Sequence, residues 1–290
     1  MVRRLRLLVV LLVALVATIG LSPGLASAAQ RPTPPEQAMG WYLALGDSYA
    51  AGYQPDRGDD KTGGYAGLVL DAVRADAPKT TLINLACSGE TTVTFLDGSH
   101  CAYDAGNQLA AAVEVLHAKR DRVRLVTIDI GGNDARRCIT ATGVDQVCYA
   151  DTLAQVGRNL TMILATLHAA SPGTPIVVAN YLNPYYALWL TGPAGQAFAH
   201  GSEQGIGMLN AVIARAAGTV GARVADVFTA YQSSVWTPVD VLGRQVPLNV
   251  VRICQWTWMC TRQDIHPNDA GYAVYATAVI AALPAVRRAA

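Results

Sequence analysis

The sequence predicts an α/β fold, in which a five-stranded parallel sheet is covered by helices on both faces. Short runs rich in Val, Ile and Leu alternate along the chain with longer amphipathic stretches. Near-continuous apolar runs are typical of strands that are buried on both faces of a sheet. A regular alternation of strands and helices indicates βαβ units, and such units build a parallel sheet with helices above and below it.

The elements are predicted in chain order from these two patterns. Strands are expected at residues 42–46, 81–86, 124–130, 175–181 and 223–228. Helices are expected at 65–75, 108–119, 149–170, 204–217 and 268–282, the last with Asn268 or Asp269 as its cap. The stretch 233–262 is rich in tryptophan, holds two cysteines and is expected to be a long, tied-down loop.

Length and composition indicate one globular domain. The 290-residue chain has 52% hydrophobic and only 15% charged residues, which is enough apolar material for a substantial core. The length fits one ordinary domain or at most two, and no linker divides the chain, so residues 41–290 are expected to form a single domain. The formal net charge of +1 gives no basic field, so no nucleic-acid partner is expected.

The N-terminal segment has the pattern of a secretory signal peptide. Three arginines within the first six residues precede an uncharged, mostly apolar run at 7–21, and the Ala-Ser-Ala motif at 26–28 supplies small residues for cleavage. We therefore assign 1–28 as a signal peptide and the proline-rich 29–40 as a flexible leader. The apolar run is shorter than the roughly 20 residues of a membrane span, and an uncleaved anchor is the alternative. The mature protein is expected to be secreted, with no membrane span.

The cysteines also suit an exported protein. Three pairs are close in sequence: Cys87 with Cys101, Cys138 with Cys148, and Cys254 with Cys260. Six cysteines allow about 15 pairings, among which short disulfide loops within these pairs are the simplest. A structural metal site is the alternative, but the spacings do not match paired CxxC knuckles, so no metal is expected.

Four polar motifs lie at predicted strand ends or just before the last helix. GDSYAAG (46–52) follows the first strand, ACSGET (86–91) the second and GGND (131–134) the third, while DIHP (264–267) precedes the last helix. In a parallel sheet, ligands bind at the carboxyl ends of the strands. The motifs are therefore predicted to meet at one edge of the sheet.

Ser48 and His266 are the candidate catalytic pair. A serine hydroxyl is a poor nucleophile at neutral pH and needs a nearby base, for which an imidazole titrates in a suitable range. Pro267 favours an extended conformation for His266, which would hold it on a loop facing the sheet edge. Attack on an ester creates an oxyanion, and the Ser48 N–H, the Gly89 N–H and the Asn133 amide are candidate donors from three strand ends. Taken singly, each residue is more often a turn, cap or loop residue, but their joint occurrence in this order favours the catalytic interpretation.

In this order and at these positions, the four motifs resemble those of the SGNH hydrolases, also called GDSL esterases and lipases. Ser48, Gly89, Asn133 and His266 match the four named blocks of that superfamily, and the resemblance covers roughly residues 41–282. The sequence looks most similar to secreted actinobacterial members with three disulfides, which supports the sequence-local cysteine pairing. The resemblance implies a flavodoxin-like three-layer α/β/α sandwich and ester hydrolysis through an acyl-serine intermediate, without a metal or cofactor.

One spacing departs from the family pattern. The family usually has Asp-x-x-His, whereas Asp264 precedes His266 by two positions. Positions i and i+2 of an extended segment point to the same side, so Asp264 could still orient the imidazole through Nδ1. A main-chain carbonyl within 261–263 is the alternative orienting group.

The segment 181–189 follows the fourth predicted strand and is expected beside the pocket. Its tyrosines and tryptophan could line an acyl groove, or they could pack against the long loop. Three acids within the motifs, Asp47, Glu90 and Asp134, are expected to hold loops by hydrogen bonds. The other four histidines are assigned to the surface or to structural roles.

The leading functional prediction is a secreted carboxylic ester hydrolase, an esterase or lipase, that acts as a monomer on small-molecule or lipid esters. A carbohydrate or peptidoglycan O-acetylesterase is the alternative enzyme, because one fold serves many substrates. A secreted binding protein on the same fold is the non-enzymatic alternative, and the complete set of motif residues argues against it. A hydride-transfer enzyme is not favoured, because no GxGxxG motif follows the first strand.

Overall fold

The computed structural model of the protein describes residues 39–140 and 143–284. The predicted signal peptide at 1–28 and residues 29–38 of the predicted leader lie outside these ranges. The first strand begins at Gly40, so the last residue assigned to the leader is part of the sheet. No helix in the described ranges is long and apolar enough to cross a lipid bilayer.

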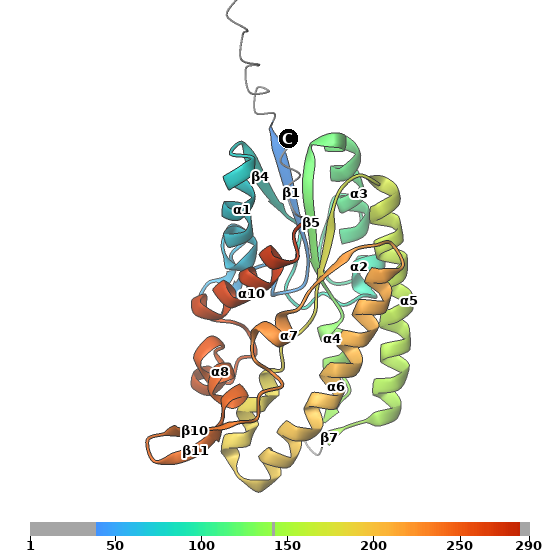
Figure 1. Cartoon of the computed structure of the whole chain (residues 1–290). Helices are drawn as coiled ribbons and strands as arrows, with labels where there is room; N and C mark the ends of the chain where they lie inside the picture. Colours follow the sequence, from blue (N-terminus) through green and yellow to red (C-terminus); the bar gives the residue numbers. More distant parts are fainter. Residues whose placement is uncertain (1–38, 141–142, 285–290) are drawn as a thin grey trace, which may run out of the picture. The chain divides into compact units, whose positions relative to one another are not determined.

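A five-stranded sheet, parallel throughout, forms the centre of the fold, as predicted (Figure 1). Its strands in chain order are β1 (Gly40–Gly46), β4 (Thr80–Asn84), β5 (Val123–Asp129), β8 (Ile176–Ala179) and β9 (Arg223–Ala225). Their order in space is β4-β1-β5-β8-β9. The second strand thus lies on one side of the first and the third on the other, which creates the switch point where ligands bind in flavodoxin-like sheets.

Helices cover both faces of this sheet (Figure 1). On one face, α1 (Gly64–Asp76) packs against α10 (Asp269–Ala281). On the other face lie α3 (Gln108–Lys119), α5 (Gln146–Ala170) and α6 (Pro193–Gly218), with α5 in contact with the other two. The predicted α/β/α sandwich is therefore confirmed.

Shorter elements complete the described part of the chain. Three two-stranded sheets pair β2 (Tyr53–Gln54) with β3 (Gly58–Asp59), β6 (Ile139–Thr140) with β7 (Gly143–Val144), and β10 (Pro238–Val241) with β11 (Arg244–Pro247). The short α-helices are α2 (Thr94–Asp97), α4 (Gly132–Arg136), α7 (Val227–Ala230), α8 (Leu248–Trp256) and α9 (Met259–Arg262). The 3₁₀ helices are η1 (Arg120–Arg122) and η2 (Pro184–Thr191).

Two predicted segments differ most from the structure, while other elements differ at their ends, as where the strand predicted at 223–228 gives way to α7 at Val227. The helix expected at 204–217 already begins at Pro193. Several glycines weaken the helical pattern of its first half, but packing against η2 stabilises the helix there. The stretch 233–262 is not an irregular loop, since it forms the β10–β11 hairpin, α8 and α9. The signal for α8 was the spacing of Val250 and Ile253, which are both buried on one face of the helix.

The apolar run that predicted β1 is buried on both sides. Tyr42, Leu43, Ala44 and Leu45 are all fully buried, because helical layers cover both faces of this strand. Full burial of a side chain of leucine size stabilises a fold by roughly 1.5–3 kcal/mol relative to exposure. The turn that follows β1 is therefore anchored to a strand whose side chains are buried in the core.

Gly46, the last residue of β1, lies against the main chain of β5. Its φ is +125°, and a Cβ at this position would lie 2.0 Å from the main-chain oxygen of Asp129. We expect Gly46→Ala to lower the free energy of unfolding by about 3–5 kcal/mol, because backbone strain and overpacking act together.

Chemical denaturation measures this loss, and Gly106→Ala is the matched control. Gly106 also has a positive φ, +94°, but an added Cβ there would meet no atom within 4 Å. The control should therefore cost only about 1–2 kcal/mol, the effect of backbone strain alone. Equal losses in the two variants would contradict the packing argument.

Candidate active site

Ser48 lies in the turn that leaves the carboxyl end of β1. The Asp47 N–H holds this turn to β5 by donating to the Asp129 carbonyl over 3.0 Å. The Asp47 carboxylate accepts from the Tyr49 N–H at 3.0 Å, and the Ser48 carbonyl accepts from the Tyr53 N–H at 3.0 Å. Ser48 is only 6% exposed, so its hydroxyl extends from a fixed and largely desolvated backbone.

His266 approaches Ser48 from the distant C-terminal part of the sequence. Its Nε2 lies 2.8 Å from the Ser48 Oγ, and its Nδ1 lies 2.6 Å from Asp264 Oδ1. In such an array the imidazole can act as a base toward the hydroxyl, while the carboxylate orients the ring. Of the two orienting groups that the sequence left open, the carboxylate of Asp264 is the one that contacts Nδ1, rather than a carbonyl within 261–263.

A local turn explains how an aspartate only two residues before the histidine reaches its ring. The same oxygen, Asp264 Oδ1, also accepts from the His266 main-chain N–H at 2.9 Å. A side-chain oxygen that accepts from the N–H two residues further along forms an Asx-turn. This turn places the carboxylate beside Nδ1 without the extra residue of the usual family spacing.

The loop that carries these two residues is held in place before substrate arrives. The Cys254–Cys260 disulfide joins α8 to α9 just ahead of it. The Trp258 N–H donates to the His266 carbonyl at 3.0 Å, and the Trp258 indole N–H donates to Gln54 Oε1 at 2.7 Å. The second bond connects the loop to β2, which directly follows the Ser48 turn. It therefore helps to fix the position of the His266 loop relative to Ser48.

Two tyrosines that follow Ser48 contact the imidazole. The Tyr53 ring lies 4.3 Å from the His266 ring, centroid to centroid, and the Tyr49 ring meets it edge-on at 5.7 Å. The Tyr49 hydroxyl also donates to the Ile265 carbonyl at 3.2 Å. Neither tyrosine was predicted as part of the site, and the one available signal was their closeness to Ser48 in the sequence.

Gly89 and Asn133 are brought together at the same edge of the sheet. Gly89 follows β4 with a φ of +85°, and Asn133 lies in α4, just after β5. The Asn133 Nδ2 donates to the main-chain carbonyl of Glu90 at 2.9 Å. An amide nitrogen carries two protons, so one remains for a ligand. Ser48 and Asn133 line one cavity, whereas Gly89 is not part of the cavity wall. Gly89 is followed by Glu90, whose carbonyl accepts from Asn133.

Buried polar side chains join these loops to one another. Asp134 accepts from the Thr92 N–H at 2.8 Å and from the Thr92 hydroxyl at 2.6 Å. Gln108 Oε1 accepts from the Gly46 N–H at 2.7 Å, while its Nε2 donates to the Gly46 carbonyl and to Glu90, both at 3.1 Å. Glu90 and Asp134 thus hold loops, as expected. Gln108, which was not predicted, fixes the end of β1.

A second acid lies beneath the Ser48 turn. Asp129 is fully buried and accepts from the Tyr65 hydroxyl at 2.6 Å and from the N–H groups of Asp47 and Ala50, each at 3.3 Å. Asp47 accepts from the Tyr181 hydroxyl at 2.6 Å. Burial raises the pKa of both carboxyl groups, and the charge of Asp47 raises the pKa of Asp129 further, well above its usual range. Burial and the repulsion from Asp47 thus both favour the protonated form of the Asp129 carboxyl group over its charged form.

We expect Asp129→Asn to change how stability depends on pH. A carboxyl group whose folded-state pKa is raised contributes stability below its unfolded-state pKa, and this contribution is lost as the pH rises through the folded-state value. The amide does not titrate. The free energy of unfolding of the variant, minus that of the native protein, should therefore increase as the pH rises from about 4 to 8.

Urea denaturation at several pH values measures this difference. Asp71→Asn, at an exposed carboxylate on α1, controls for the removal of one negative charge. Parallel pH dependence in the native protein and the Asp129 variant would show that the buried acid does not act as inferred.

A cavity of about 530 Å³, including its open mouth, adjoins Ser48. Most of its wall is apolar or aromatic, with Ile139, Tyr149, Tyr181, Leu182, Pro184, Tyr185, Ile206 and Leu209 as the main contributors. The segment 181–189 takes both of the roles that the sequence left open. Tyr181 and Tyr185 line the cavity, whereas the buried Tyr186 packs against Trp236 at a ring separation of 5.1 Å.

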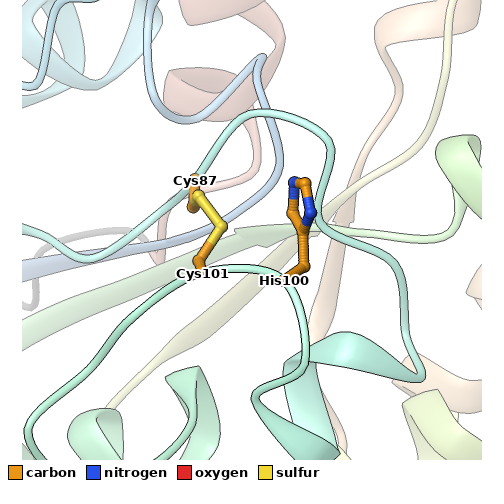
Figure 2. A group of neighbouring side chains, drawn as sticks. All are labelled: Cys87, His100 and Cys101. Carbon is orange, nitrogen blue, oxygen red and sulfur yellow. A yellow bond between two sulfur atoms is a disulfide. The ribbon is translucent and has the colours of Figure 1, made fainter.

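The cysteines form three disulfides between sequence neighbours: Cys87–Cys101, Cys138–Cys148 and Cys254–Cys260. Figure 2 shows the first of these with His100 beside it, a grouping of potential metal ligands. Because both sulfur atoms are bonded to each other, they cannot serve as thiolate ligands. His100 Nε2 instead lies 2.9 Å from the Ser88 carbonyl, and a Cβ on Gly89 would lie 2.6 Å from that nitrogen.

The sequence from residue 44 to residue 274 matches the GDSL-like Lipase/Acylhydrolase family. The match spans the Ser48 turn, Gly89, Asn133 and the loop of Asp264 and His266. The chain belongs to this family. No curated protein shows a significant match to this GDSL-family protein.

Two solved structures of hydrolases share the fold of this GDSL-family protein with TM-scores above 0.5, and a third hydrolase structure has a lower score. Lip_vut3, a lipase from a goat rumen metagenome, is 15% identical with a TM-score of 0.52, covering 84% of this chain and 97% of the other. A mutant of Axe2, an acetyl-xylooligosaccharide esterase from Geobacillus stearothermophilus, is 18% identical with a TM-score of 0.51, covering 86% and 98%. An extracellular lipase from Streptomyces rimosus is 22% identical with a TM-score of 0.49, covering 84% and 100%. At these identities the likeness concerns the fold alone.

Proposed function

We propose that this GDSL-family hydrolase is a secreted carboxylic ester hydrolase that works through an acyl-serine intermediate. The observation that carries the proposal is the hydrogen-bonded array of Ser48, His266 and Asp264, with contacts of 2.8 and 2.6 Å. The array stands at the switch point of the sheet and beside a largely apolar cavity, which is where a parallel α/β fold binds its ligands.

The reaction proceeds in two halves. As the Ser48 Oγ bonds to the ester carbonyl carbon, His266 Nε2 takes the hydroxyl proton and Asp264 stabilises the imidazolium. His266 then returns this proton to the departing alcohol oxygen, and the acyl group remains on Ser48. Water, deprotonated by His266, attacks the acyl carbon, and the acid leaves as the serine hydroxyl is restored.

Three donors are proposed for the oxyanion that forms in each half: the Ser48 N–H, the Gly89 N–H and the second proton of Asn133 Nδ2. Positive φ at Gly89 and the bond from Asn133 to the Glu90 carbonyl fix the loops that present two of these donors. Fixed donors stabilise developing negative charge strongly, because they need no reorganisation during the reaction.

We expect Asn133→Ala to lower kcat by about 10²–10³, with a smaller effect on KM, because the amide binds the transition state more strongly than the ground state. Asn159→Ala is the matched control. It removes an amide that donates to Thr92 Oγ1 at 3.1 Å in the same loop network, and Asn159 does not line the cavity. Steady-state kinetics on one ester compares them, and an equal loss in both variants would argue against the oxyanion role.

Secretion is supported by two features. Residues 1–28 have the pattern of a signal peptide, and the three disulfides suit an oxidising compartment. Expression of the full chain in a secreting host should yield medium protein whose N-terminal residue is Ala29, as read by mass spectrometry. Retention of residues 1–28 on the recovered protein would contradict cleavage.

The experiment that tests the ester hydrolase is turnover of p-nitrophenyl esters from acetyl to palmitoyl, together with labelling by a fluorophosphonate. Turnover and a covalent adduct mapped to Ser48 are expected. The apolar cavity favours longer chains than acetyl. A preference for acetyl alone would indicate the O-acetylesterase instead. Neither turnover nor a label on disulfide-bonded protein would indicate a binding protein on this fold.

A further inference from the structure

One cation lines the cavity beside Ser48. Arg136 is the last residue of α4 and the only lysine or arginine among the described residues of the cavity wall. Its side chain is exposed. It makes no hydrogen bond or ion pair with any other residue in the part of the chain that the structure describes.

The next residue in the sequence provides a contrast. Arg137 donates to Thr152 Oγ1 at 3.2 Å and to Gln155 Oε1 at 3.3 Å, and it is not part of the cavity wall. Arg137 therefore has side-chain partners, whereas the Arg136 side chain has no hydrogen-bond or ion-pair partner among the residues that the structure describes. A guanidinium is always charged and offers five N–H donors in a planar fork that fits a carboxylate or a phosphate.

Arg136 lies close to the position proposed for the reacting carbonyl. It follows Asn133 by three positions on α4, and residues so spaced are neighbours on one helix face, with Cβ atoms about 5–6 Å apart. Since Asn133 is proposed to donate to the carbonyl oxygen, a negative group a few bonds from the ester would lie within reach of Arg136.

The other titratable groups of the wall leave this charge available. Asp47 is the only acid among the described wall residues, and its oxygens already accept from the Tyr49 N–H and the Tyr181 hydroxyl. Burial raises the pKa of Tyr185, and the positive charge of Arg136 opposes this rise, which indicates that the guanidinium lies near the phenol at the cavity wall. The remaining wall side chains beyond Asn133 are apolar residues, tyrosines and Ser48.

We propose that Arg136 makes the site selective for amphiphilic esters, in which an apolar chain occupies the cavity and a carboxylate or phosphate near the ester binds the guanidinium. This inference rests on the proposed ester hydrolysis at Ser48 and names its substrate class. The binding group is an anion in both cases, and the source of the anion is decided by the experiment below.

The test compares matched pairs of esters. The first pair is 4-nitrophenyl butanoate and 3-carboxy-4-nitrophenyl butanoate, which differ by one carboxylate. The second pair is 1-octanoylglycerol and its 3-phosphate, which differ by one phosphate. For each protein the readout is the ratio of kcat/KM for the anionic ester over the neutral ester. Dividing the ratio of a variant by that of the native protein cancels the intrinsic reactivity of the esters.

The expected result is a fall of about 5–10-fold in this ratio for Arg136→Gln, since a charge-assisted bond at a half-open site is lost. Arg136→Lys should fall less, because it keeps the charge but loses the planar fork. Arg137→Gln, the matched control, should keep the native ratio. Higher salt should weaken the native preference by screening the charge. A fall confined to one pair supports the inference and identifies the anion as a carboxylate or a phosphate.

Equal ratios for Arg136→Gln and Arg137→Gln in both pairs would overturn the inference, and hydrolysis of the neutral esters would show that the proposed function still stands. If the native protein hydrolyses none of the four esters and Ser48 takes no fluorophosphonate label, the ester hydrolase proposal fails and this inference fails with it.

Discussion

Replacing Ser48 with alanine should remove nearly all ester hydrolysis while leaving the fold intact. The hydroxyl is the atom proposed to bond to substrate, and His266 has nothing to deprotonate without it. We expect kcat on p-nitrophenyl butanoate to fall on the order of 10⁴-fold or more. The remaining activity would come from the oxyanion donors and from substrate binding. The side chain is small and its backbone bonds are unaffected, so the thermal unfolding midpoint should change little.

Ser234→Ala is the matched control, because Ser234 is an exposed serine outside the cavity wall. This variant should keep native kinetics. Undiminished turnover by Ser48→Ala, measured on protein purified away from host esterases, would refute the acyl-serine mechanism. A loss of both turnover and folded structure would instead place Ser48 among the residues needed for stability.

The second large effect on kcat is expected when Asp264 is replaced. Asp264 Oδ1 contacts both the ring Nδ1 and the main-chain N–H of His266, so it sets the ring orientation and its tautomer. Asp264→Asn should lower kcat by about 10³–10⁴, because an amide does not stabilise the imidazolium and favours the wrong tautomer. Asp264→Ala should lose a similar amount, and it also removes the Asx-turn.

Asp269→Asn is the control for loss of a nearby carboxylate, since Asp269 lies exposed in the first turn of α10. Its kinetics should stay close to native. A loss below about tenfold in Asp264→Ala would favour a main-chain carbonyl within 261–263 as the orienting group, because removal of a working acid costs far more. Comparing the pH profiles of kcat/KM for the variants adds a readout that a purely structural role would not move.

The fold could be predicted where the pattern of apolar residues has one interpretation. The strand at β1 and the helix at α3 follow from continuous burial and from helical periodicity, and α3 spans the predicted 108–119. The pattern failed at the start of α6, where glycines carry no periodic signal and contacts with η2 stabilise the helix. It failed again at 233–262, where short elements depend on their neighbours rather than on local propensity.

Some residues of the candidate site could likewise be predicted from the sequence, and others could not. Ser48, Gly89, Asn133 and His266 could be selected because each stands in a motif at a strand end or just before the last helix, and the structure brings these motifs to one edge of the sheet. Residues that act through their position in space gave no such signal. Asp129 is the last residue of the strand β5, and only the packing of the neighbouring elements pairs its carboxyl group with that of Asp47.

Ser48 and His266, the proposed catalytic pair, lie far apart in the sequence, and this separation has a consequence for the synthesis of the protein. Asp264 and His266 form a unit through contacts two residues apart, whereas His266 meets Ser48 across 218 residues. A growing chain that has not reached His266 therefore lacks the proposed base for Ser48. Bringing His266 to Ser48 closes a loop of 218 positions, which costs chain entropy. Under the proposed mechanism, a chain that ends before His266 is therefore inactive.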